Sequence, residues 1–287
     1  MSTGSQIELA RDFIDLEKYP IDGRNPDGYA AAVAEARSQL AVDGCCVLSG
    51  FIQSSKLQAL AEEAAQVAPA AHRSFNRTNP YFTEDNKELS PEDPRRRFYD
   101  RSNAFVPADN FGEASALRAI YEFAGFQTFI KDTLQADHFY RYADPLADVI
   151  INLVEEGEGF PWHFDTNNFT VTLAIANGES GGVFEYAPNL RTADDECFDD
   201  VKDVLDERSD RVKSLQLVPG DLQIFKGRYS LHRVTPVRGA KKRYVGIFSF
   251  VEHEGMVGSV ERTRQLYGRV LPIHHERAGH RADRLQD

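Results

Sequence analysis

The residues best suited to chemistry are His163 and Asp165, two positions apart in the stretch PWHFD at 161–165. Residues i and i+2 of a β-strand point to the same face, so the imidazole and the carboxylate can share one target. His232, in another strand-like stretch at 231–234, offers a second imidazole. Two histidines and one carboxylate hold non-haem Fe(II) and leave further coordination positions open. The spacing therefore predicts a metal site formed by His163, Asp165 and His232.

Short strands must bring these side chains together, and the clearest strand pattern is at 169–176. Large apolar residues alternate there with small or polar ones, as a strand with two different faces requires. The small set predicts a cavity wall, and it consists of Thr170, Thr172, Ala174 and Ala176. The large set predicts an outer core, and it consists of Phe169, Val171, Leu173 and Ile175. Further strands are predicted at residues 45–48, 138–142, 148–155, 183–186, 213–217, 222–225, 231–237 and 243–251.

Helices are predicted mainly in the first half of the chain, from apolar residues at helical spacing. They lie at residues 25–44, 54–67, 115–134, 195–207 and 259–267. Gly125 favours a break in the third helix, and Ser259 is the expected N-cap of the last. Residues 1–24 are predicted to be a poorly structured lead-in. Many short strands after a few helices predict a mainly β fold with flanking helices, a double-sheet jelly roll.

Residues 68–112 are rich in proline and polar residues and show little periodicity. A loop of this length in a compact chain is either functional or disordered. Its arginine and aromatic residues suit a lid that recognises a carboxylate, because arginine binds that group through two parallel hydrogen bonds. A solvated surface loop explains the same composition equally well.

Composition and charge restrict the partners. The chain has 287 residues, a net charge of −12 and a pI of about 5.2. An acidic surface does not attract nucleic acid or anionic membrane, so we expect neither as a partner. The chain has three cysteines, an N-terminus without an apolar core, and no apolar run long enough to span a bilayer. These features predict a reducing, cytoplasmic location.

Motifs around the predicted metal site resemble those of one known family, the Fe(II)/2-oxoglutarate-dependent oxygenases. The family's H-x-D…H…R pattern is matched by His163, Asp165, His232 and Arg243. GGVFEY at 181–186 resembles the family's G-G-x-F-E strand, and PGDLQIF at 219–225 resembles the turn and strand before its second histidine. The resemblance covers residues 138–252 and is weaker upstream.

The resemblance implies the distorted double-stranded β-helix, a cupin-like jelly roll, in a single domain over residues 1–287. Within it, 1–137 would be a helical support and long loop, 138–252 the jelly-roll core, and 253–287 a C-terminal helix and tail. The tail contains His274, His275 and His280, and we expect it to be flexible rather than a metal site.

The resemblance also implies a reaction. Fe(II), with 2-oxoglutarate as cosubstrate and O2, would hydroxylate an unactivated C–H bond of a small molecule and release succinate and CO2. Arg243 would bind the distal carboxylate of 2-oxoglutarate, since arginine grips such a group bidentately; a surface salt bridge is the alternative. Asn152, a polar residue in an apolar strand, would also touch the cosubstrate or make a hydrogen bond within the sheet.

Asp165 favours hydroxylation over halogenation, because related halogenases have a small residue in its place, which leaves a metal position for chloride. The stretches at 163–169 and 185–189 are most similar to a bacterial branch of hydroxylases and halogenases that act on free amino acids. A free amino acid is therefore the predicted substrate, and a zwitterion needs a cation for its carboxylate and an acid or carbonyl for its ammonium. The residues predicted for these contacts are Arg77, Arg73, Asp144 and Asn168.

Three other functions are compatible with the sequence. The same chemistry could act on a larger natural-product scaffold, which differs only in pocket size. A metal-binding jelly roll without oxygen chemistry has no use for Arg243, which argues against it. A zinc hydrolase could use the same ligands, but no general base lies beside them in the sequence. A homodimer is left open by the sequence.

Overall fold

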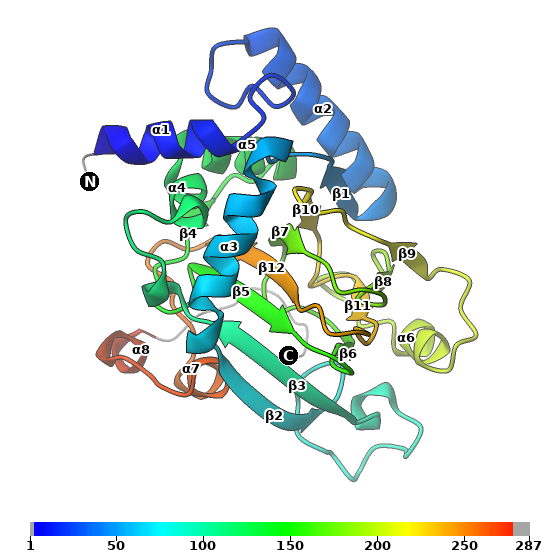
Figure 1. Ribbon diagram of the computed structural model, residues 1–287. Coiled ribbons are helices and arrows are strands. Elements are labelled where there is room, and N and C mark those ends of the chain that lie inside the picture. The colour runs from blue at the N-terminus through cyan, green and yellow to red at the C-terminus, as the bar shows by residue number, and fades with distance from the viewer. Residues whose placement is uncertain (1–2, 278–287) are drawn as a thin grey trace.

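Two antiparallel sheets form the centre of the computed structural model, which describes residues 3–277 (Figure 1). The major sheet has the strand order β1-β10-β7-β12-β5-β3-β2 and the minor sheet the order β6-β11-β8-β9. The major-sheet strands are β1 Cys45–Leu48, β2 His72–Thr78, β3 Tyr99–Val106, β5 Val149–Val154, β7 Thr170–Ala176, β10 Leu222–Phe225 and β12 Arg243–Phe248. The minor-sheet strands are β6 Phe160–His163, β8 Phe184–Ala187, β9 Lys213–Leu215 and β11 Leu231–Val234. Two short strands, β4 Tyr140–Arg141 and β13 Phe250–Val251, pair separately. The predicted jelly roll is confirmed.

The register of the sheets places the predicted ligands. In the minor sheet, β11 pairs antiparallel with β6 so that His232 lies opposite His163. Side chains of directly opposed residues are neighbours, and the two imidazole centroids lie 4.2 Å apart. In the major sheet, β12 pairs with β5 so that Val245 lies opposite Asn152. The two sheets therefore bring residues distant in sequence to one interior.

Helices in the first half of the chain cover the outer face of the major sheet, and they are α1 Thr3–Phe13, α2 Pro26–Asp43, α3 Leu57–Val67, α4 Ala116–Glu122 and α5 Ala124–Leu134. The later helices lie elsewhere: α6 Phe198–Leu205 packs beside the minor sheet, α7 Val260–Tyr267 contacts β2 and β3 and lines the interior, and α8 Pro272–Glu276 packs on α7. Apolar residues of α1 to α5 pack with Val171, Leu173 and Ile175 into the largest core cluster, while Thr170 and Thr172 line the interior. The predicted division of β7 into two faces is thus observed. Within residues 3–277, no helix is both long and apolar enough to cross a membrane.

Two stretches predicted to be irregular are regular. Residues 3–13 form α1, and much of 68–112 forms β2 and β3, which pair and extend the major sheet at one edge. Both strands are polar because they lie at or beside the edge of the sheet. The prolines of this region lie outside them, at Pro69, Pro80, Pro91, Pro94 and Pro107. The prediction of one long loop is therefore wrong, and the sheet also takes in strands from before residue 138.

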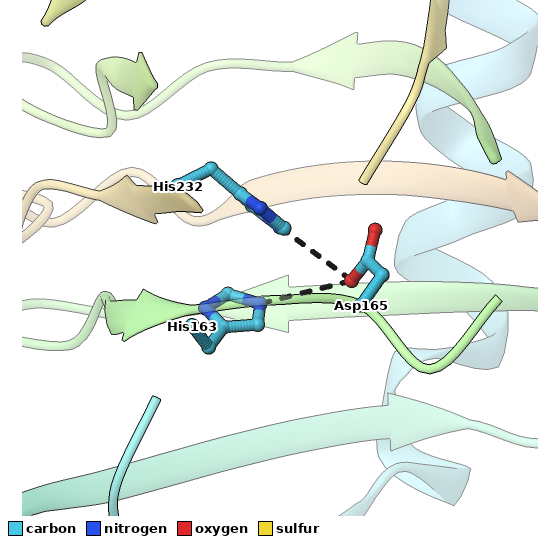
Figure 2. A group of neighbouring side chains, drawn as sticks. All are labelled: His163, Asp165 and His232. Carbon is cyan, nitrogen blue, oxygen red and sulfur yellow. Dashed lines mark ion pairs between the residues drawn. The ribbon is translucent and has the colours of Figure 1, made fainter. Parts of the chain in front are cut away.

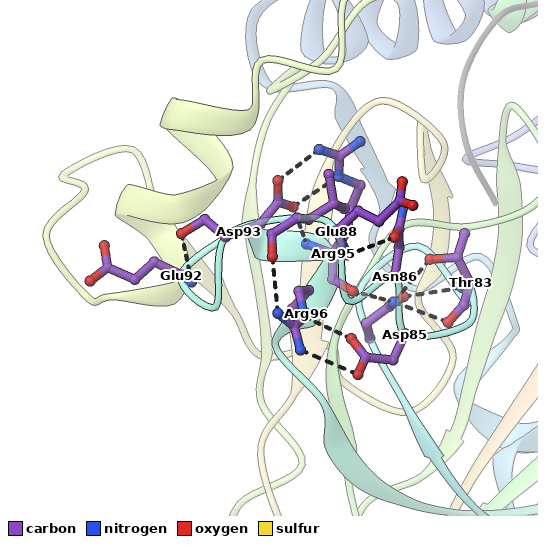
Figure 3. A network of polar contacts seen from close by, with 11 residues as sticks. Thr83, Asp85, Asn86, Glu88, Glu92, Asp93, Arg95 and Arg96 are labelled. Atoms are coloured by element: carbon purple, nitrogen blue, oxygen red, sulfur yellow. Dashed lines mark hydrogen bonds and ion pairs between the residues drawn. The ribbon is translucent and has the colours of Figure 1, made fainter.

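The connection between β2 and β3 is held in one shape by its own polar groups (Figure 3). The buried amide of Asn79 donates to Thr83 Oγ1 at 2.9 Å and to the Arg95 carbonyl at 2.6 Å. Arg95 and Arg96 make ion pairs with two aspartates of the connection, Asp93 at 2.7 Å and Asp85 at 2.8 Å. This framework sets the position of Phe82, whose φ is 57°.

The predicted helix at 115–134 is interrupted at Phe123, between α4 and α5. Just beyond the break, a Cβ on Gly125 would stand 1.8 Å from the carbonyl oxygen of Ile21. Glycine is needed there because the backbone of α5 packs directly against the segment before α2. The expected effect of Gly125 is therefore close approach as well as a break.

The C-terminal segment packs against the core. Ser259 caps α7 as predicted, accepting a hydrogen bond from the Arg262 amide at 3.2 Å. His274 is buried, and its Nε2 lies 3.0 Å from Asp144 Oδ2. The prediction of a flexible tail is therefore wrong for His274, while His280 lies outside the described residues.

Candidate metal centre and substrate cavity

The three predicted ligands converge at the end of β6 (Figure 2). Asp165 Oδ1 lies 3.8 Å from His163 Nε2 and 3.5 Å from His232 Nε2. His163 is the last residue of β6, and Asp165 follows just outside the strand. Ligand atoms each about 2.1 Å from one metal lie at most about 4.2 Å apart. The three side chains therefore fit one metal ion.

Backbone carbonyls fix the orientation of both imidazoles. His163 Nδ1 lies 2.7 Å from the Pro161 carbonyl, and His232 Nδ1 lies 3.0 Å from the Ser230 carbonyl. A carbonyl only accepts hydrogen bonds, so each Nδ1 carries the proton. Each Nε2 consequently presents its lone pair toward Asp165, as a metal-binding histidine must.

The protonation states also suit metal binding. Burial, with added repulsion from His232 and Arg101, lowers the pKa of His163 well below its usual value. Burial alone would raise the pKa of Asp165, but the imidazoles and the Thr170 hydroxyl outweigh it and hold this pKa below the ordinary value. Neutral imidazole and carboxylate are the forms that bind metal.

Asp165 itself is held from two sides. The Thr170 hydroxyl donates to Asp165 Oδ2 at 2.5 Å, and the Asp165 amide donates to the Gly227 carbonyl at 3.1 Å. A Cβ on Gly227 would lie 1.9 Å from Asp165 Oδ2. Only glycine leaves room for the carboxylate here, and Oδ1 is left to face the metal. The set of two imidazoles and one carboxylate fits Fe(II), with further positions open.

A cavity of about 270 Å³ extends from these ligands between the two sheets. Its lining includes all three ligands, Arg243 and Asn152, together with apolar side chains from both sheets. Concave, mostly apolar spaces with a few placed polar groups are the usual form of small-molecule sites. The cavity is therefore where a cosubstrate and a substrate would meet the metal.

Arg243 begins β12 and is 8% exposed. Burial lowers its pKa to about 10, and no charge within residues 3–277 counters this effect. A buried cation without a counter-ion is costly, so the cavity around it favours an anion. This is the setting expected for the distal carboxylate of 2-oxoglutarate and differs from a surface salt bridge.

Asn152 lines the cavity and is buried, as predicted for a residue facing the cosubstrate. Its Nδ2 also donates to the Ala104 carbonyl at 3.3 Å, so the alternative of a hydrogen bond within the sheet is present too. Close by, Thr172 donates to Gln223 Oε1 at 3.0 Å, and both residues line the same cavity. The strands thus give one cavity wall fixed amide and hydroxyl groups.

Asp144, predicted to bind substrate, lines the cavity, but its carboxylate is already engaged. Oδ2 is 3.0 Å from His274 Nε2 and accepts the Gly258 amide at 2.9 Å, while Oδ1 accepts the Leu146 amide at 2.8 Å. These contacts anchor the C-terminal segment. The structure gives Asp144 the role of an anchor in place of an ammonium partner.

The other three residues predicted for substrate do not line this cavity. Arg73 pairs with Glu155 at 2.6 Å and with Glu158, and Arg77 is exposed on the edge strand β2. Asn168 is hydrogen-bonded to Glu252 and lines a separate hollow. Asn168 was chosen because it follows Asp165 closely in the sequence, but Thr166 and Asn167 of the same turn line the cavity instead.

Three further residues line the cavity, Phe82, Arg101 and Arg262, and none of them was assigned to the site individually. They come from the β2–β3 connection, from β3 and from α7. No short motif joins them. Phe82 and Arg101 belong to the 68–112 stretch whose aromatic and arginine residues suited a lid, and Arg262 lies in the first turn of a predicted helix.

Three solved structures share this fold, and the descriptions of two of them name dependence on 2-oxoglutarate. An oxidoreductase of the 2OG-Fe(II) oxygenase family from Burkholderia pseudomallei aligns over 78% of this chain and 92% of its own, with 14% identity and a TM-score of 0.51. AviO1 from Streptomyces viridochromogenes Tue57 aligns over 77% and 96%, with 14% identity and a TM-score of 0.53. SnoN, a non-heme α-ketoglutarate-dependent epimerase from nogalamycin biosynthesis, aligns over 78% and 84%, with 14% identity and a TM-score of 0.51.

Fold and site together define the class of the protein, a non-haem iron, 2-oxoglutarate-dependent oxygenase. The sequence assigns it more narrowly: residues 29–267 match the family model of Halogenase D, and the chain belongs to that family. No curated protein matches the chain.

Proposed function

We propose that this protein hydroxylates an unactivated C–H bond of a free amino acid, with Fe(II), 2-oxoglutarate and O2, releasing succinate and CO2. The observation that carries the proposal is the carboxylate of Asp165, which faces both imidazoles as a third protein ligand. A carboxylate in this position occupies the place that a halide would need on the metal. Hydroxylation is therefore favoured over halogenation.

The protein's own contribution is binding, orientation and exclusion of water. When bound, iron and 2-oxoglutarate supply the oxidising power that the side chains lack. His163, Asp165 and His232 hold the metal from one side and leave the cavity side open. Arg243 orients the cosubstrate by its distal carboxylate. Apolar side chains such as Phe160 keep the space between them dry.

Cavity size supports a small substrate. The cavity of about 270 Å³ has to admit 2-oxoglutarate as well as the substrate. Sites for drug-sized ligands occupy about 300–1,000 Å³. A free amino acid suits the remaining space better than a large natural-product scaffold, which is the competing oxygenase function.

The test is anaerobic loading with Fe(II), then addition of 2-oxoglutarate, air and each member of a panel of free amino acids. Succinate formed together with one added oxygen atom on one amino acid is the expected result. Slow succinate with every amino acid and no product would retain the oxygenase and remove the amino-acid assignment. Absence of both succinate and Fe(II)-dependent 2-oxoglutarate binding would favour a zinc hydrolase or a non-catalytic barrel.

Halogenation is the second candidate, because the matching family is described as Halogenase D. The same assay in the presence of chloride separates the two reactions by product mass. A chlorinated product from the unaltered protein would establish halogenation despite Asp165. An inactive Asp165→Gly variant would not decide between them, so the unaltered protein is the one to use.

A further inference from the structure

Two arginines outside the metal and cosubstrate positions share one aromatic surface in the cavity. The guanidinium carbon of Arg101 lies 4.8 Å from the ring centre of Phe82, and that of Arg262 lies 4.7 Å from it. The Phe82 ring centre is 5.7 Å from that of the ligand His163. Two cations therefore contact one ring, and that ring lies beside a predicted metal ligand.

This wall is held in place by its surroundings. Phe82 has a left-handed φ of 57°, which is rare for a large residue and is sustained by the Asn79 framework of the connection. Arg262 Nη1 donates to Gln265 Oε1 at 2.7 Å, and Arg101 also stacks on Phe160 at 5.1 Å. The arrangement is thus preorganised.

Charge in the cavity favours an anionic ligand. Fe(II) and 2-oxoglutarate would carry opposite double charges, so the single carboxylate of Asp165 would be left to face three cations, Arg243, Arg101 and Arg262. Of the described residues that line the cavity, Asp144 is the one other carboxylate, and His274 with two backbone amides already engages it. Arg262 has a neutral hydrogen-bond partner, the amide of Gln265.

The two cations also act on each other. Burial, and after it the charge of Arg262, lowers the pKa of Arg101 well below its usual value. Burial lowers the pKa of Arg262 as well. An anion bound in the cavity near both arginines would relieve both desolvation and repulsion, because charge-assisted hydrogen bonds to guanidinium groups are among the strongest.

On the basis of the proposed function, we propose that Arg262, together with Arg101, selects an acidic amino acid as the substrate. Such a substrate has two carboxylates and one ammonium, so it brings one net negative charge to the pair of arginines. A basic amino acid would place a like charge against them. A neutral amide of the same shape would leave one guanidinium without its anion.

The experiment compares shape-matched pairs, aspartate with asparagine and glutamate with glutamine, and includes lysine. Binding is measured by calorimetry without oxygen on protein saturated with Fe(II) and 2-oxoglutarate, and turnover by product mass. The acid of the better pair should bind at least about 30-fold more tightly than its amide. Arg262→Gln should reduce this ratio at least tenfold and leave the KM for 2-oxoglutarate unchanged. Arg264→Gln, on an exposed residue of the same helix, is the matched control and should change neither.

Arg262→Lys keeps the charge and loses the planar fork, so it should retain a weaker preference for the acid. Equal affinities of the unaltered protein for the acid, the amide and lysine would overturn the inference. An acid-to-amide affinity ratio that is unchanged in Arg262→Gln would overturn it as well. Hydroxylation of a neutral or basic amino acid would uphold the proposed function and reject the acidic class. Arg262-dependent binding of malate, without a product from any amino acid, would support an acidic ligand at the two arginines and reject the proposed function.

Discussion

The two ends of the cavity are built differently. The metal and cosubstrate end is formed by strands and by residues directly after them, with His163 opposite His232 in the minor sheet and Arg243 at the start of β12. The other end is formed by Phe82 from a connection, Arg101 from a strand near the sheet edge, and a residue of the terminal helix α7. In the proposed function, sheet register would fix the reaction, and residues from the connection, the sheet edge and α7 would determine what reacts.

The largest effect should follow loss of a metal ligand. Asp165→Ala or His232→Ala should abolish succinate formation. Loss of an outer hydrogen-bond partner of a metal ligand weakens metal binding about 10–100-fold, and loss of the ligand itself should weaken Fe(II) binding more than that. Fe(II) binding by titration and succinate by mass are the measurements. His253→Ala, at an exposed histidine, is the control and should bind iron normally. Iron-dependent turnover in either ligand variant would break the assignment of this end.

Loss of Arg243 should affect the cosubstrate and spare the substrate. Arg243→Gln should raise the KM for 2-oxoglutarate at least about 30-fold, because a buried charge partner worth about 2 kcal/mol or more is removed. Arg73→Gln, which breaks a pair on the same sheet outside the cavity, should leave that KM unchanged. If the KM for the amino acid rose and the KM for 2-oxoglutarate did not, Arg243 would belong to the substrate site and not to the cosubstrate site.

His274 should contribute to stability and not to metal binding. His274→Ala removes a buried partner of Asp144 and should lower the free energy of unfolding by about 2 kcal/mol. Thermal unfolding compared with His275→Ala, an exposed neighbour, measures this difference. Equal losses in the two variants would show that the contact with Asp144 does not anchor the segment.

The smallest effect is expected at Thr170, which supports a ligand without touching the metal. Thr170→Val keeps the shape, removes the hydrogen bond to Asp165 Oδ2 and should weaken Fe(II) binding about tenfold. Thr172→Val, on the same face of β7, loses a bond to Gln223 instead and is the matched control. Identical iron affinities for the two variants would contradict the role given to Thr170.

The same contrast explains what the sequence predicted of the fold. The alternation in β7 and the apolar runs of β5 and β10 were recognisable because each strand packs against a core on at least one face. β2 and β3 were missed because polar residues dominate strands at a sheet edge, where burial leaves little pattern. α1 was missed as well, although it packs on the main core.

Site residues divide in the same way. The ligands and Arg243 lie in short motifs whose spacing reflects strand geometry, so their convergence could be expected. Arg101 and Arg262 reach the same Phe82 ring only through packing of β3 against the terminal segment, which one sequence does not encode as a motif. Asn168 was chosen by proximity to Asp165, and a turn points neighbouring side chains in different directions.

The placement of Arg262 on α7 has an evolutionary consequence. This helix of eight residues is joined to the core through its cap, its packing and the His274–Asp144 contact, and it provides no metal ligand. Mutations on its inner face can therefore alter which molecules are accepted while the oxidative machinery is conserved. Related enzymes could therefore differ in substrate specificity while they keep the same reaction. Exchange of this helix offers a compact route for directed evolution of specificity.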